Sequence, residues 1–338
     1  MQQETIIIFG ATGNLGAYTA MHLKEKGYNI IAVGLRKSDN NFFKENNMQY
    51  YSVDITNAID FDKLPQSDIS AVVNFAGELP SRYRFDPTKL INTIILGTLN
   101  ILEYMKKCNC KKIIFPQTPY DIIEHYKEGV PLKADLPRIF PKTGDHSIYT
   151  IAKNAAVDLI EHYHYEYGFT RFILRFFTIY EYHPNPYHYA DFKKRMMPFR
   201  MLMRRAQESL PIEIWGDATK AKEMVYIKDF TYLVELCVKT DIDGGIYNVG
   251  NGWQVSLDEQ IKGIVEVFSP KDNPSKIKYA PEKPDPLVNA FDISKTISEL
   301  GYKPQYTYLE HLKDFKLEME KETFAKLWGR KEDYEDIC

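Results

Sequence analysis

The stretch Ile6-Ile7-Ile8-Phe9-Gly10-Ala11-Thr12-Gly13-Asn14-Leu15-Gly16 decides the fold. Its four leading apolar residues carry no charge and predict a buried parallel strand. A helical pattern follows as far as Lys26, and Gly27 ends it. Glycines between a strand and a helix let the backbone approach a pyrophosphate, which the helix N-terminus can bind. The G-x-x-G-x-x-G spacing therefore predicts a dinucleotide-binding unit, although a simple tight turn would use the same glycines.

Apolar runs and helical patterns alternate through the first half of the chain. Further strands are expected at 29–33, 50–53, 71–75, 112–115 and 172–176, and long helices at 87–107 and 149–167. This alternation predicts an α/β fold with a Rossmann-type, doubly wound parallel sheet. Ligands of such a sheet bind at the carboxyl ends of its strands.

The pattern changes after Phe177. An aromatic loop is expected at 180–189, a basic helix at 193–208, and short strands at 212–215 and 224–227. These elements predict a smaller C-terminal α/β domain for a substrate. We expect a dinucleotide-binding domain formed by 1–178 with 220–250, and a substrate-binding domain formed by 179–219 with 251–338.

Composition argues against several classes of protein. A net charge of −3 predicts no basic surface for nucleic acid. No apolar stretch is long enough to span a membrane, and the N-terminus lacks the basic residues of a signal peptide. The cysteines and histidines show no metal-ligand spacing, so no metal is expected. Free thiols in a reducing cytoplasm are expected at Cys108, Cys110, Cys237 and Cys338.

Tyr149 and Lys153 form the clearest candidate for acid–base chemistry. Their i, i+4 spacing places them on one face of the long helix. A neighbouring cation stabilises the phenolate, so we expect Lys153 to lower the pKa of Tyr149 from about 10. Such a tyrosine can exchange a proton near neutral pH. A surface tyrosine and a solvated lysine at chance spacing is the alternative, which the preceding dinucleotide-binding unit disfavours.

From Ile6 to about Phe315 the chain resembles the extended short-chain dehydrogenase/reductase family, which includes nucleotide-sugar epimerases, dehydratases and 4-keto reductases. The ordered motifs that carry the resemblance are the glycine turn, Asn74-Phe75-Ala76-Gly77, Gly97-Thr98-Leu99-Asn100, Tyr149 with Lys153, Leu174-Arg175-Phe176-Phe177, Ile214-Trp215-Gly216-Asp217, Val225-Tyr226-Ile227-Lys228-Asp229, Tyr247-Asn248-Val249-Gly250 and Asp292-Ile293-Ser294-Lys295.

The resemblance implies roles for particular residues. Tyr149 would shuttle the proton of a sugar hydroxyl, Thr118 would bond that hydroxyl, and Lys153 would also hold the nicotinamide ribose. The implied cofactor-binding residues are Gly10, Thr12, Gly13, Asn14, Leu15, Gly16, Arg36, Asp54, Ile55, Phe75, Ala76, Gly77 and Lys153. The implied substrate-binding residues are Thr178, Lys222 and Lys283.

The sequence departs from the family pattern at three places, which affect the expected reaction and the expected sugar site. Thr118 is followed by Pro119 and Tyr120, where the dehydratases carry an Asp–Glu pair, so a dehydratase is disfavoured. Lys222 and Lys283 stand where arginines are usual, and a lysine keeps the charge but loses the bidentate fork. Gln117 and Pro119 are unusual neighbours of Thr118 and are expected to reshape the sugar site.

The choice of cofactor depends on the end of the second strand. The family pattern puts the acidic residue of NAD-specific members at Gly34, which has no side chain. Arg36 follows two residues later, and its guanidinium can bind a 2′-phosphate. We therefore expect NADP, with NAD as the alternative.

Together these features indicate a cytoplasmic, homodimeric nucleotide-sugar enzyme. A nicotinamide-dependent 4-epimerase acting through a 4-keto intermediate is expected first. An NADPH-dependent keto-sugar reductase or dehydrogenase is the second reading, and the NADP expectation favours it. A non-catalytic, NADP-sensing protein of the same fold is the third.

Overall fold

The computed structural model describes residues 3–80, 86–190, 193–285, 288 and 290–334. Seven parallel strands form its central sheet, in the order β13-β6-β5-β4-β1-β2-β3. The strands are β1 (Thr5–Phe9), β2 (Asn29–Gly34), β3 (Gln49–Ser52), β4 (Ala71–Asn74), β5 (Lys112–Gln117), β6 (Thr170–Arg175) and β13 (Gly244–Asn248). The order reverses between β1 and β4, so the turn after β1 opens at the switch point, where such sheets bind ligands.

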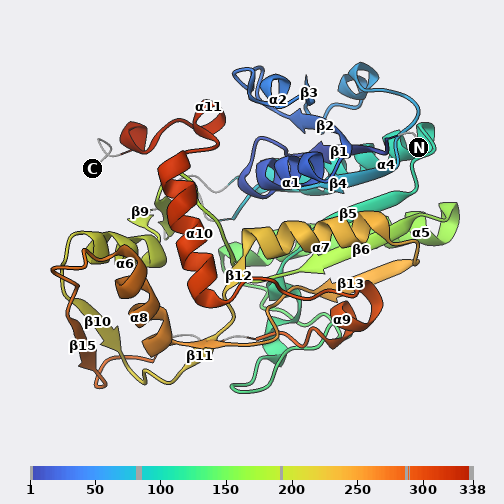
Figure 1. Cartoon of the computed structure of the whole chain (residues 1–338). Coiled ribbons are helices and arrows are strands. Elements are labelled where there is room, and N and C mark those ends of the chain that lie inside the picture. Colours follow the sequence, from blue (N-terminus) through green and yellow to red (C-terminus); the bar gives the residue numbers. More distant parts are fainter. Residues whose placement is uncertain (1–2, 81–85, 191–192, 286–287, 289, 335–338) are drawn as a thin grey trace.

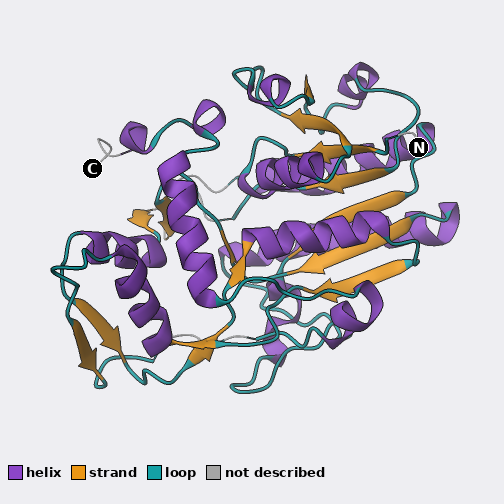
Figure 2. Ribbon diagram, in the orientation of Figure 1, coloured by secondary structure: helices purple, strands orange, loops and turns teal. Residues whose placement is uncertain are grey.

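Helices cover both faces of this sheet (Figures 1 and 2). Alternate residues of β1 separate the two cores: Ile6 and Ile8 belong to one, and Ile7 and Phe9 to the other. The helices are α1 (Asn14–Glu25) and α7 (Ile227–Lys239) on the first face, and α3 (Pro87–Ile91), α4 (Gly97–Lys107) and α5 (Asp145–Tyr167) on the second. Both faces of the central strands are therefore buried, and β1, β2 and β4 consist mostly of buried apolar residues.

The remaining helices and strands lie mostly beyond the carboxyl ends of the sheet strands (Figure 1). Short strands pair as β7 (Ile179–Tyr180) with β12 (Val225–Tyr226), β8 (Tyr187–Ala190) with β9 (Lys193–Met196), β10 (Ile212–Trp215) with β15 (Ile277–Ala280), and β11 (Ala221–Lys222) with β14 (Val255–Ser256). Helices here are α6 (Pro198–Gln207), α8 (Leu257–Phe268), α10 (Tyr308–Lys321) and α11 (Ala325–Trp328), while α9 (Ser294–Leu300) packs beside β13. The remaining short helical segments are α2 (Phe42–Glu45), η1 (Ala58–Lys63), η2 (Asn92–Leu96), η3 (Pro119–His125) and η4 (Lys331–Tyr334).

The expected α/β class and parallel sheet are confirmed, and several element boundaries differ. The region expected to be one helix at 193–208 begins as β9, and α6 starts only at Pro198, because proline fits the first helical position. Part of the expected loop at 180–189 is β8, which pairs with β9. A π-helical turn, η2, interrupts the helix expected at 87–107. Helix α5 begins four residues before Tyr149, which places the tyrosine inside the helix.

Cys108, Cys110 and Cys237 are buried free thiols, and Cys338 lies outside the described residues. Within the described ranges, no helix is long and apolar enough to cross a membrane. No group of three metal-ligating side chains occurs in that part of the chain.

Candidate active site

The turn after β1 requires its glycines. Gly10 has a φ of +76°, and a Cβ atom there would lie 2.6 Å from the backbone nitrogen of Ala76. A Cβ on Gly16 would collide with the carbonyl of Gly10. The N–H of Gly13 donates to that same carbonyl at 3.0 Å. Among the described residues no side chain caps the N-terminus of α1, so its first N–H groups can serve an anionic ligand.

The loop after β4 lies against this turn. Asn74 is fully buried, and its Oδ1 accepts a hydrogen bond from the Ala76 N–H at 3.1 Å. The Phe75 N–H donates to the carbonyl of Phe9 at 2.9 Å. The fold therefore brings together two of the predicted cofactor-binding stretches, the glycine turn and 75–77.

The residues after β3 form the next edge of the same region. The Val53 N–H donates to the carbonyl of Gly34 at 2.9 Å, which joins the end of β3 to the end of β2. Asp54 accepts hydrogen bonds from the backbone and hydroxyl of Thr56 through one oxygen, Oδ1. Ile55 is buried, and Asn100 binds its carbonyl at 2.8 Å. Asp54 and Ile55 are thus fixed beside the strand end that leads to Arg36.

Arg36 is exposed, but its guanidinium is already engaged. Its Nη1 donates to the carbonyl of Leu327, in α11, at 2.6 Å. The carbonyl of Arg36 accepts a hydrogen bond from the hydroxyl of Tyr50. The NADP expectation therefore rests on a side chain, that of Arg36, which contacts α11 near the C-terminus. The residues around Arg36 in the sequence do not predict this contact.

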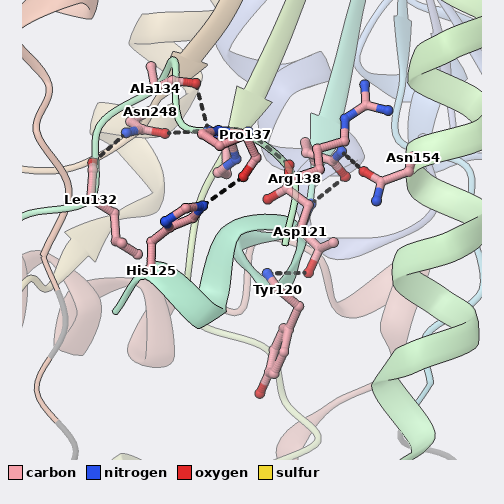
Figure 3. Close-up of polar contacts among 12 residues, drawn as sticks. Tyr120, Asp121, His125, Leu132, Ala134, Pro137, Arg138, Asn154 and Asn248 are labelled. Atoms are coloured by element: carbon pink, nitrogen blue, oxygen red, sulfur yellow. Dashed lines mark hydrogen bonds and ion pairs between the residues drawn. The ribbon is translucent and has the colours of Figure 1, made fainter. Parts of the chain in front are cut away.

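Thr118 lies at the carboxyl end of β5, where a substrate would approach. Its side chain is 5% exposed and caps η3, accepting a hydrogen bond from the Tyr120 N–H at 3.3 Å (Figure 3). Pro119 takes the first position of that turn. The hydroxyl therefore has a fixed direction before any substrate binds.

Lys153 joins α5 to the end of β5. Its Nζ donates to the carbonyl of Pro116 at 2.9 Å, and it lies 4.4 Å from the centre of the Phe115 ring. The distance from Nζ to the centre of the Tyr149 ring is 5.8 Å. The tyrosine, the lysine and the residues leading to Thr118 are thus held in one neighbourhood.

Burial sets the titration of this pair. It raises the pKa of the Tyr149 phenol above its usual value and lowers the pKa of Lys153 to about 7. The expectation that the Lys153 cation lowers the Tyr149 pKa is contradicted, because desolvation dominates at both groups. Both side chains are shifted toward their neutral forms, and the amine of Lys153 is the one that titrates near neutral pH.

Gln117 connects these catalytic candidates. It is 2% exposed; its Oε1 accepts from the Thr118 N–H at 2.8 Å, and its Nε2 donates to Asn154 at 3.0 Å. Asn154 follows Lys153 directly and is buried. The sequence marked Gln117 as unusual but offered no signal for Asn154.

A buried ion pair holds Asp121, which lies in η3 (Figure 3). Arg175, at the end of β6, donates through Nη2 to Asp121 at 2.8 Å, and its Nη1 binds Ala134 and Asn248. Both charged side chains are at most 1% exposed. Burial raises the pKa of Asp121, and the guanidinium opposes that shift. Asp121 is therefore engaged as a structural partner.

The predicted substrate residues lie on separate elements. Thr178 is exposed just after β6. Lys222 is half-buried in β11, with Nζ 5.8 Å from the centre of the Tyr180 ring. Lys283 is exposed, with Nζ 5.2 Å from the centre of the Trp215 ring. A cavity of about 340 Å³ is lined by Lys220, Ala221 and Tyr126 among others, and Lys222 follows Ala221 in the chain. These contacts leave the substrate roles as predictions.

The fold and the tyrosine–lysine pair together define a Rossmann-type enzyme with a dinucleotide site. The model of the NAD dependent epimerase/dehydratase family matches residues 6–250. The chain belongs to this family and is an NAD(P)-dependent epimerase/oxidoreductase of the extended short-chain dehydrogenase/reductase type.

Similar proteins include nucleotide-sugar enzymes. The UDP-glucuronate 4-epimerase of Thermodesulfobacterium geofontis is 29% identical, over 81% of this chain and 80% of its own. The structure of a UDP-glucose 4-epimerase from Thermotoga maritima with UDP-glucose has a TM-score of 0.73 at 23% identity, covering 94% of this chain and 99% of that one. A UDP-glucuronic acid 4-epimerase from Bacillus cereus, in complex with NAD, has a TM-score of 0.69 at 23% identity and covers 92% and 98%.

Proposed function

We propose that this chain is a nucleotide-sugar 4-epimerase that acts through a 4-keto intermediate with a nicotinamide cofactor. The observation that carries the proposal is the position of Lys153, which joins the helix of Tyr149 to β5, the strand that ends just before Thr118. These groups lie at the same edge of the sheet as the glycine turn. The 4-epimerases among the similar proteins support the reaction class, and their UDP-sugar names suggest the substrate class.

The residues of the glycine turn fit a dinucleotide. A Cβ on Gly10 or Gly16 would collide with neighbouring backbone, so these glycines keep the turn tight, and the N-terminus of α1 offers its N–H groups to a pyrophosphate. When bound, the nicotinamide supplies hydride acceptance and return. Lys153 and the 75–77 loop would hold the cofactor on the sheet side, with Asp54 and Ile55 at its adenosine end.

The side chains of this chain supply the proton chemistry. As the phenolate, Tyr149 would take the proton of the sugar 4-hydroxyl while the ketone forms, and would return it to the same oxygen after the sugar has presented its other face to the cofactor. Thr118 directs that hydroxyl by a hydrogen bond. The neutral amine of Lys153, whose pKa of about 7 lets it gain and lose a proton at neutral pH, would accept the phenol proton and so form that phenolate. In the described segment after β5, Pro119 and Tyr120 follow Thr118 where a dehydratase would carry an acidic pair, and Asp121 is bound to Arg175.

We keep NADP as the cofactor proposed from Arg36, with NAD as the alternative. The guanidinium has N–H groups beyond the one that binds Leu327, and these could meet a 2′-phosphate. The NAD complex of a structural relative supports the alternative.

A second candidate is reduction of a keto-sugar by NADPH, which the lack of a carboxylate at Gly34 favours. The third, a cofactor sensor without activity, is disfavoured because Tyr149 and Lys153 are both present and placed together. A cytoplasmic location and a homodimer formed through α4 and α5 remain predictions, and light scattering coupled to size-exclusion chromatography tests the dimer.

One assay separates the three candidates. Purified protein is incubated with UDP-glucose or UDP-glucuronate, and the products are resolved by chromatography. A 4-epimerase interconverts the 4-epimers without net change in nicotinamide absorbance. A reductase consumes NADPH only when a 4-keto-sugar is added. Absence of turnover in both, together with cofactor binding, would overturn the epimerase proposal in favour of the sensor.

A further inference from the structure

Trp328, near the C-terminus, is bonded to the glycine turn. Its indole is 5% exposed, and its Nε1 donates to the carbonyl of Thr12 at 2.9 Å across 316 positions of sequence. The ring is flanked by Phe324 at 4.4 Å and His183 at 4.6 Å between ring centres. This bond occupies an acceptor on the loop that would hold the pyrophosphate, so the position of the turn depends on Trp328.

The two residues before Trp328 contact the end of β2. The carbonyl of Leu327 accepts from Arg36 Nη1 at 2.6 Å, and the carbonyl of Lys326 accepts from Asn40 Nδ2 at 2.9 Å. The Lys326 ammonium pairs with Glu45 at 2.6 Å. Figure 1 shows α11 leaving the top of α10 to lie beside the loop between β2 and α2. Three consecutive residues therefore border both the pyrophosphate turn and the ribose edge.

The segment 323–334 is held by further contacts on both sides of Trp328. Phe324 packs on Tyr18 of α1 at 4.5 Å and on Phe42 of α2 at 5.5 Å between ring centres. The hydroxyl of Tyr334 donates to the carbonyl of Trp328. The family match ends at residue 250, so residues 323–334 lie outside the matched part of the chain while the residues they contact there lie inside it.

We propose that the C-terminal segment 323–334 supports cofactor binding at the dinucleotide site. In this role Trp328 holds the glycine turn in position, and Leu327 holds Arg36 at the ribose edge. This inference rests on the proposed cofactor. It assigns Trp328 as a positioning residue for cofactor binding. By linkage, a cofactor that needs the segment in place must also hold the segment in place.

The first test is cofactor titration by calorimetry into stripped wild-type protein and the Trp328→Phe variant. Phenylalanine keeps one aromatic ring in the stack and removes the N–H donor together with the five-membered ring of the indole. We expect dissociation constants about five- to tenfold higher, mainly from the lost hydrogen bond. Trp253→Phe is the matched control, because this half-buried tryptophan lies in the loop before β14 and should leave the constants unchanged. Equal affinities in wild type and Trp328→Phe would overturn the inference.

The second test follows the segment itself. Trypsin is expected to cut after Lys326, Arg330 or Lys331, and the rate is measured by mass spectrometry with and without saturating NAD or NADP. We expect the cofactor to slow these cuts several-fold in wild type and less in Trp328→Phe. Protection that is absent, or equal in the two proteins, would contradict the linkage. If wild type binds neither dinucleotide in the titration, the proposed function itself fails, which is a different result from binding that ignores Trp328.

Discussion

The Nε2 of Gln117 donates to the Oδ1 of Asn154 at 3.0 Å, inside the wall of the active site. The orientation of this pair follows from the hydrogen bonds, because Oε1 of Gln117 accepts the Thr118 N–H, which leaves its amide nitrogen facing Asn154. One side chain thus links the residue after Lys153 to the backbone of Thr118. The two halves of the candidate catalytic set share a buried, satisfied amide contact.

This contact predicts that Asn154→Ala impairs catalysis without touching a reacting group. The buried Gln117 donor would lose its partner, at a cost of about 1–3 kcal/mol in unfolding free energy. We expect kcat to fall about tenfold with little change in KM, because Thr118 and Lys153 lose their shared support. Asn154→Asp retains the acceptor and should recover most of kcat. A kcat equal to wild type in Asn154→Ala would contradict the positioning role.

Replacement of Tyr149 by phenylalanine tests the proton shuttle. Only the reacting oxygen is removed, so turnover should nearly vanish while the dissociation constant for the cofactor stays within about twofold of wild type. Tyr165→Phe is the matched control, since Tyr165 is on the same helix and is 80% exposed. Full turnover of the true substrate by Tyr149→Phe would refute the assignment.

Substitutions of the other two catalytic candidates, Lys153 and Thr118, should have different effects on cofactor binding and turnover. Lys153→Met is expected to weaken cofactor binding as well as turnover, because the amine is proposed to hold the ribose. Thr118→Val should slow turnover about tenfold to a thousandfold, in the range of one lost polar contact in a transition state. Dissociation constants and steady-state rates measured together distinguish these outcomes, and cofactor binding unaffected by Lys153→Met would remove the ribose role.

Arg36→Ala tests the proposed choice of NADP. If the guanidinium meets a 2′-phosphate, wild type should prefer NADP, and the variant should lose about 1.5–3 kcal/mol of NADP binding with NAD binding changed much less. Lys37→Ala removes the same charge one residue later and serves as the control. Tighter binding of NAD in wild type, or an unchanged preference in Arg36→Ala, would count against NADP.

The buried His311, in α10, predicts that the stability of the folded chain decreases at acid pH. The ring is 2% exposed and stacked on Tyr226, and burial lowers its pKa from 6.5 to about 3. The unfolded chain binds the proton first as pH falls below 6.5, so the folded state loses stability from there down to about pH 3. Between pH 7 and 5 this group alone should cost wild type about 2 kcal/mol.

His311→Phe keeps the stack on Tyr226 and removes the titrating ring. We expect the variant to lose about 2 kcal/mol less than wild type when urea unfolding is compared at pH 7 and pH 5. An identical pH dependence in the two proteins would show that His311 does not remain neutral in the folded chain.

Local sequence determined the parts of this protein whose partners are close along the chain. The strand at Ile6, the glycine turn and the i, i+4 relation of Tyr149 and Lys153 follow from periodicity and backbone sterics, which act within a few residues. The capping box of Ser256 with Glu259, at the start of α8, likewise depends on two residues that are three positions apart.

Tertiary structure decided what depends on distant segments meeting. The sequence does not show that Trp328 reaches Thr12, that Asn154 meets Gln117, or that residues 187–190 pair with β9 as a strand. It also predicted the wrong direction for the Tyr149 pKa, because spacing places a lysine nearby but only packing excludes the water around both groups. Hydrogen-bond partners and desolvation are properties of the folded neighbourhood, whereas turns and helical faces are properties of the local chain.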